Sequence, residues 1–110
     1  MKILATGRLG EGVTVADLAP YQQAELRQAW QLYRDGVIRE QYTRTDGPGV
    51  VLMLEAASLE HAHAAIDSLP MVAAGVLAFD AMPLGPFLHL EALFKPAVEA
   101  EVAASEQAGR

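Results

Sequence analysis

An acidic residue stands on the apolar side of a helix that is expected over residues 21–35. Apolar residues recur along this stretch with the period of an α-helix, so one half of the helix should face a core and the other half water. Glu25 falls on the apolar half, and Gln22 points the same way. A carboxylate among apolar side chains is either paired with another group or used in chemistry. Glu25 is therefore the first candidate for a functional residue.

The helices and strands that must position Glu25 can be located from the spacing of apolar residues along the chain, which differs between helices and strands. In order, the expected elements are a strand at 2–6, the helix at 21–35, strands at 37–44 and 50–55, a helix at 59–69 and a strand at 76–82. Pro20 suits the first position of the long helix, and Gly36 suits a left-handed C-cap at its end. Ser58 is a good N-cap for the second helix, and Pro70 stops it.

This order of elements is that of the ferredoxin-like βαββαβ motif. The expected fold is α+β, with a four-stranded antiparallel sheet and both helices on one face. The strands at 50–55 and 76–82 carry apolar residues on both faces, so the face without helices also needs a cover. We expect a second subunit there, giving a homodimeric α+β barrel or a higher homo-oligomer. An apolar arm at 87–94 is expected to cross onto that subunit.

The length and composition are those of one globular domain, expected at 1–94, followed by an Ala/Glu-rich tail at 95–110. The absence of cysteine excludes disulfides and thiolate metal sites and fits a cytoplasmic protein. A formal net charge of −6 argues against a nucleic-acid or anionic-membrane partner, because both need clustered basic residues. The apolar run at the N-terminus is too short for a signal peptide or a membrane span.

Neither a metal nor a cofactor is expected. His61 and His63 are two residues apart on the second helix, so their side chains diverge and cannot bind one ion together. His89 lies in the apolar arm, away from both. The glycines of the first loop lack the order of a dinucleotide-binding fingerprint, and no helix follows them directly.

The spacing of several residues resembles that of the muconolactone isomerase family of dimeric α+β barrel proteins. The matching spacings are the eleven residues from Glu25 to Gly36, the pattern Gly36-x-x-Arg39, and the eleven residues from Ser58 to the Leu69-Pro70 pair. The resemblance extends over residues 20–86. It implies a cofactor-free isomerase of aromatic catabolism that shifts a double bond by proton transfer in a small carboxylated lactone or enone.

The same resemblance implies roles for individual residues. Such a reaction needs a base for a carbon-bound proton and a cation for the substrate carboxylate. Glu25 would be the base, with its pKa raised by burial, and Arg39 would bind the carboxylate in a bidentate fork. Tyr42 would donate to the developing enolate oxygen, while Gln22 and Met53 would line the substrate site.

The chain also departs from the family pattern. Glu40 stands where a histidine is expected after the strand arginine, and the third strand lacks the expected aromatic and asparagine residues. Gly85-Pro86-Phe87 replaces a His-Pro ending. These departures favour a larger or more apolar ligand than muconolactone, next to Met53.

Structural alternatives stand beside each assigned role. Glu25 is alternatively the partner of Arg39 or of another buried donor. Arg39 is alternatively a salt bridge at a sheet edge or dimer contact, and Tyr42 a part of the barrel wall. The alternative function is a non-catalytic dimeric barrel that binds an apolar small molecule. The deciding observation is whether Glu25 faces an open cavity or is neutralised by a packed salt bridge.

Overall fold

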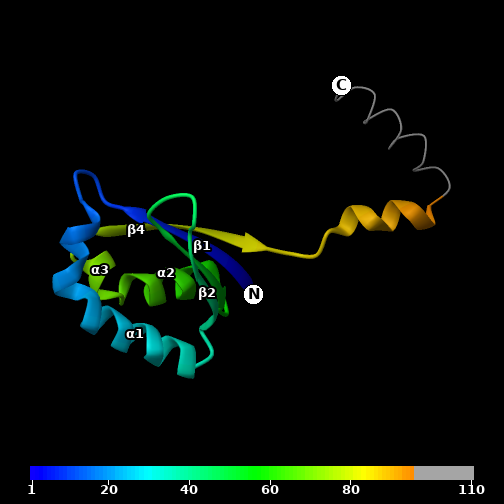
Figure 1. Cartoon of the computed structure of the whole chain (residues 1–110). Helices are drawn as coiled ribbons and strands as arrows, with labels where there is room; N and C mark the ends of the chain where they lie inside the picture. Colours follow the sequence, from blue (N-terminus) through cyan, green and yellow to red (C-terminus); the bar gives the residue numbers. More distant parts are fainter. Residues whose placement is uncertain (96–110) are drawn as a thin grey trace.

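A four-stranded antiparallel sheet is the frame of the protein, whose residues 1–95 are described by a computed structural model (Figure 1). The elements are β1 (Lys2–Leu9), η1 (Val15–Tyr21), α1 (Gln22–Arg34), β2 (Ile38–Thr43), β3 (Val50–Glu55), α2 (Leu59–Asp67), α3 (Pro70–Ala73), β4 (Leu77–Leu84) and η2 (Leu88–Phe94), where η marks a 3-10 helix. The strand order is β2-β3-β1-β4, and α1 and α2 lie on the same side of the sheet. The predicted α+β, ferredoxin-like fold is confirmed. Apart from Lys95, the predicted tail at 95–110 lies outside the described residues.

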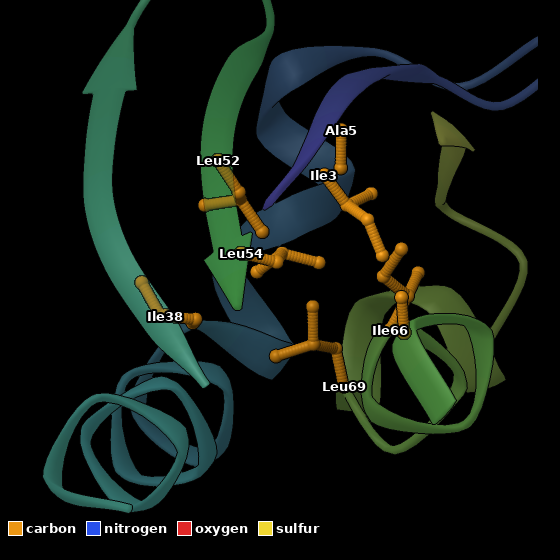
Figure 2. Packing of buried hydrophobic residues seen from close by; sticks show 8 residues of the cluster. Ile3, Ala5, Ile38, Leu52, Leu54, Ile66 and Leu69 are labelled. Atoms are coloured by element: carbon orange, nitrogen blue, oxygen red, sulfur yellow. The ribbon is translucent and has the colours of Figure 1, made fainter. Parts of the chain in front are cut away.

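The core fills the space between the sheet and the helices (Figure 2). Alternation along β1 turns Ile3 and Ala5 toward the helices, and both are fully buried. The residues that meet there are Ile3, Ala5, Ile38, Leu52, Leu54, Ala62, Ile66 and Leu69. Each fully buried Leu or Ile contributes roughly 1.5–3 kcal/mol through its removal from water. This cluster packs α2 against the sheet, and Ala29 and Leu32 of α1 pack against it.

The ends of the helices follow from their capping residues. Gly36 takes a left-handed conformation with φ of 79° after α1, and the Ser58 hydroxyl accepts a hydrogen bond from the His61 N–H over 3.1 Å. Both predicted caps are thereby confirmed. The start of the long helix differs, because Pro20 lies within η1 and α1 begins at Gln22. The Asp17 carboxylate accepts from the Thr14 N–H over 2.8 Å and so begins a helical turn before Pro20.

A β-bulge at Arg39 sets the orientation of β2. Ile38 pairs with Leu54 and Glu40 with Met53, so Arg39 is an extra residue between two adjacent pairs. After the bulge, Glu40 and Tyr42 share the face of Met53, which points away from the helices. The intervening residues of β2 turn toward the helices, because they lie opposite residues of β3 that face the core.

The helices leave the other face of the sheet uncovered. Apolar side chains at the centre of this bare face come from all four strands: Leu4, Tyr42, Val51, Met53, Met82 and Leu84. Tyr42 is 57% exposed and Met82 is 56% exposed. The edge is polar and carries an ion pair between Arg8 and Asp80. An apolar centre with a charged edge is typical of a surface that binds another protein.

The apolar segment after β4 extends away from the domain (Figure 1). Helix η2 and the preceding Phe87 carry five large apolar side chains, and each is mostly exposed, Phe94 to 83%. No helix among residues 1–95 is long and apolar enough to cross a membrane.

Candidate ligand-binding site

A cavity of about 580 Å³ lies between the sheet and the helical segment formed by η1 and α1. Its walls are mainly apolar. The apolar residues of this lining are Leu9, Val15, Leu18, Ala19, Leu26, Ala29, Ile38, Pro48, Val50, Leu52, Leu69, Met71, Leu77 and Phe79. A cavity of this size and composition is typical of small-molecule sites, which place a few polar groups in an apolar lining.

Glu25 projects into this cavity from the first turn of α1. Its Oε1 atom accepts a hydrogen bond from the backbone N–H of Met71 over 2.9 Å. Burial raises the pKa of Glu25, because removal from water disfavours the charged form, and the hydrogen bond from Met71 offsets part of this effect. The direction predicted from the sequence is confirmed.

The contact with Met71 also explains why an acid is tolerated at this position. Met71 is the second residue of α3, and N–H groups in the first turn of a helix have no partner within it. Glu25 supplies the missing acceptor from another element. Within the described residues its second oxygen, Oε2, accepts no hydrogen bond. One oxygen thus orients the carboxylate, while the other is available to a ligand.

Two polar residues of the cavity were not predicted from the sequence. Gln41 and Thr43 line it from β2, opposite Leu52 and Val50 of β3. Gln22 lines it from the start of α1, one turn before Glu25. Besides the Glu25 carboxylate, the polar side chains that line the cavity are therefore those of Gln22, Gln41, Thr43 and Tyr42. The sequence does contain one indication of this pair. Gln41 and Thr43 are two residues apart, so their side chains lie on the same face of the strand.

Arg39 is not among the residues that line the cavity. It is exposed at the bulge, and its charge acts on Glu55 of β3. The pKa of Glu55 is lowered chiefly by the N-terminal ammonium, which donates to its carboxylate over 2.7 Å, and Arg39 adds to this effect. The structure therefore does not bring Glu25 and Arg39 together.

Tyr42 and Met53 share the face of the sheet that points away from the helices. Tyr42 borders the cavity, but its hydroxyl donates to the Glu40 carboxylate over 3.2 Å. This hydrogen bond, together with the negative charge of Glu40, raises the pKa of Tyr42, because both favour the protonated phenol. Met53 is absent from the lining of the cavity and instead belongs to the apolar centre of the bare face.

The histidines take no part in this cavity. In the described part of the chain, no three His, Cys, Asp or Glu side chains are arranged to hold a metal ion. His61 Nδ1 lies 2.8 Å from the Ser58 hydroxyl at the start of α2, where it supports the helix cap.

Known structures share this fold. Muconolactone isomerase superposes with a TM-score of 0.64 at 17% identity, over 78% of this chain and 90% of that chain. The 5-chloro-2-hydroxyhydroquinone dehydrochlorinase of Burkholderia phenoliruptrix, solved with 2,5-dihydroxybenzoquinone, gives 0.62 at 18% identity, over 79% and 97%. No family model and no curated protein matches the sequence. The predicted muconolactone isomerase-like fold is confirmed, and at this identity the likeness extends to the fold alone.

Proposed function

We propose that the protein is a cofactor-free enzyme that shifts a double bond by proton transfer in a small molecule bound in the cavity. The observation that carries this proposal is the state of Glu25, a carboxylate that lines an apolar cavity and has a raised pKa, with one of its oxygens anchored by Met71. A base for a carbon acid works best when its pKa is raised toward the working pH. The two similar structures are themselves named as enzymes of small molecules, an isomerase and a dehydrochlorinase.

The proposed reaction needs a substrate with an acidic C–H next to a carbonyl group. Oε2 of Glu25 removes that proton, and the electron pair moves onto the carbonyl oxygen to form an enolate. A neutral donor at the cavity wall, the Gln41 amide or the Thr43 hydroxyl, stabilises the enolate oxygen. Protonated Glu25, whose acidic proton can exchange with solvent, then delivers a proton to the far carbon of the conjugated system. Atoms and charge balance, and the double bond has moved.

The remaining site residues have different positions in this proposal. Gln22 binds the ligand beside Glu25, because it lines the same cavity one turn earlier on the helix. Tyr42 and Met53 belong to a contact with a second subunit, since their side chains lie on the bare face. Arg39 serves a structural or interfacial role at the bulge rather than as the substrate anchor.

The test is a panel of small lactones and enones in deuterated water. Wild-type protein should exchange an acidic carbon-bound proton of at least one member and produce its conjugated isomer, followed by NMR and ultraviolet absorbance. Glu25→Gln should lose both signals. Exchange that persists in Glu25→Gln would remove Glu25 from the role of base.

A second candidate function is non-catalytic binding of an apolar small molecule. The hydrogen bond from Met71 favours it, because it gives Glu25 a structural task without any reaction. Under this alternative, calorimetry detects a ligand that stabilises the protein, while deuterium exchange into that ligand is absent from wild type and variant alike.

We also propose that the bare face binds a second copy of the chain. Exposed apolar side chains such as Met82 and Tyr42 support this, and the exposed segment from Phe87 to Phe94 offers further apolar surface to the same partner. Sedimentation over a dilution series tests it. A monomer at every concentration would overturn the proposal.

A further inference from the structure

We infer that the cavity takes an uncharged ring compound, of the cyclic enone type, in preference to a carboxylated one. The inference rests on the proposed function and names its substrate class. It differs from the carboxylated substrate that the sequence resemblance implies. The observation that supports it is the charge of the side chains that line the cavity.

The described residues that line the cavity include one carboxylate, Glu25, and no Lys, Arg or His. A carboxylate ligand would leave its hydration shell without gaining a cation. It would also lie in the same apolar space as Glu25, and two like charges in one site repel each other. An uncharged ligand avoids both costs.

An arginine that directly follows a cavity residue of β2 is paired with another side chain. Arg44 directly follows β2, beyond Thr43, but its Nε and Nη2 atoms donate to the two carboxylate oxygens of Asp46 over 2.9 and 2.8 Å. Arg39 lies at the bulge and acts on Glu55. The Arg44 guanidinium thus already holds a carboxylate in a bidentate pair, and Arg44 is not among the residues that line the cavity.

The polar groups that do line the cavity suit an uncharged ligand. The amides of Gln22 and Gln41 each provide N–H donors and a carbonyl acceptor, and Thr43 provides a hydroxyl. An N–H donor from Gln41 matches a ketone oxygen, and the apolar wall formed by Leu52 and Phe79 matches a ring. Such a ligand presents the acidic C–H next to its carbonyl to Glu25.

The experiment compares two probes of matched size that differ in charge. One is a β,γ-unsaturated cyclohexenone with a carboxamidomethyl group, and the other is the same ring with a carboxymethyl group in its place. Binding to the full chain is measured by calorimetry, and turnover by the absorbance of the conjugated product. We expect wild type to bind the uncharged probe at least tenfold more tightly and to turn it over with the higher kcat/KM.

Two arginine variants provide a matched comparison. Gln41→Arg places a cation in the cavity, whereas Gln23→Arg places it on α1 at a position outside the cavity lining. Gln41→Arg should shift the preference toward the carboxylated probe by about tenfold or more, and Gln23→Arg should not. Thermal unfolding of both variants shows that the fold is retained.

The two proposals fail in different ways. Tighter binding or faster turnover of the carboxylated probe by wild type overturns the inferred substrate class and leaves Glu25 as the base. Preferential binding of the uncharged probe without turnover or deuterium exchange supports the substrate class and overturns the catalytic function. Binding of neither probe overturns the inferred class, and exchange on the wider lactone and enone panel then still decides the function.

Discussion

The carboxylate of Glu25 and the backbone N–H of Met71 are joined by a hydrogen bond of 2.9 Å across 46 positions of the chain. This contact connects the long helix α1 to the short helix α3. It gives Glu25 an orientation that does not depend on a bound ligand. Substitutions at Glu25 must therefore separate the contribution of its charge from that of its hydrogen bond.

Glu25→Gln should retain the fold and lose the proposed activity. The Gln amide oxygen still accepts from Met71, but it cannot take a proton from carbon. Turnover should fall by about a hundred- to ten-thousand-fold, the usual contribution of a positioned general base. The free energy of unfolding, from urea titration, should change by less than about 1 kcal/mol. As a control, Glu25→Ala also removes the acceptor and should cost about 1–3 kcal/mol, because the Met71 N–H is left without a protein partner.

The stability of the protein should fall as the pH rises, because the pKa of Glu25 is raised in the folded state. Folded protein binds the Glu25 proton more tightly than unfolded protein does, so stability is full below the ordinary value of 4.5 and falls as the pH rises through the raised pKa. The melting temperature of wild type, relative to that of Glu25→Gln, should therefore fall between pH 4 and pH 7. A wild type that gains stability over this range relative to the variant would show that the carboxylate is stabilised in the folded state.

The pH dependence of turnover should follow the same group. A base must be ionised to act, so kcat/KM for the uncharged enone should rise with pH through the raised pKa of Glu25. The measurement is a pH–rate profile on wild type under conditions where the protein stays folded. A profile that is flat from pH 4 to pH 7 would argue against Glu25.

Gly7→Ala should reduce both stability and ligand binding. A Cβ at Gly7 would lie 2.7 Å from Cε1 and Cζ of Phe79 and 2.9 Å from Cγ2 of Val50, so the Phe79 ring must move. Phe79 and Val50 both line the cavity, and overpacking of this kind costs about 1–3 kcal/mol. Urea titration and calorimetry with the uncharged probe measure the two effects.

Gly47→Ala is the matched control for this substitution, because no atom beyond the two neighbouring residues of the chain lies within 4 Å of its added Cβ. It should leave stability within about 0.5 kcal/mol of wild type. The double variant Gly7→Ala/Phe79→Leu should recover part of the lost stability. An equal loss in Gly7→Ala and Gly47→Ala would show that the contact with Phe79 is unimportant.

Met53→Lys should dissociate the proposed dimer. Met53 lies in the apolar centre of the bare face, so a charge there would be buried against the second copy without a partner. Sedimentation should show a dimer for wild type and a monomer for the variant. Tyr33→Lys, on the exposed side of α1, is the control and should remain dimeric.

Much of the fold follows from the sequence because its signals are local. The cap residues Gly36 and Ser58 and the apolar period of the two helices located the end of α1 and the start of α2, and the change to a period of two located the strands along the chain. Glu25 could likewise be identified from the sequence, because it is a single acidic residue on an otherwise apolar helix face. Burial and the direction of the pKa shift follow from that position alone.

The residues on β2 could not be placed in the same way. Both faces of this strand mix polar and apolar residues, so its pattern does not reveal a bulge. The extra residue at Arg39 changes which side chains face the helices, and it brings Gln41 rather than Tyr42 to point at the core side. The contact with the Met71 N–H could not be predicted for a different reason. Every residue except proline has a backbone N–H, so the residue type does not show which one acts as a donor.

The central position of β1 has a consequence for folding. It pairs on one side with β3 and on the other with β4, where Lys2 is opposite Leu84. Within this sheet, β1 is synthesised first but completes its pairing only when β4 has been made. Closing so long a loop slows the formation of the native sheet. Until β4 is synthesised, one edge of β1 remains open, and this is the stage at which the nascent chain is most exposed to pairing with other strands.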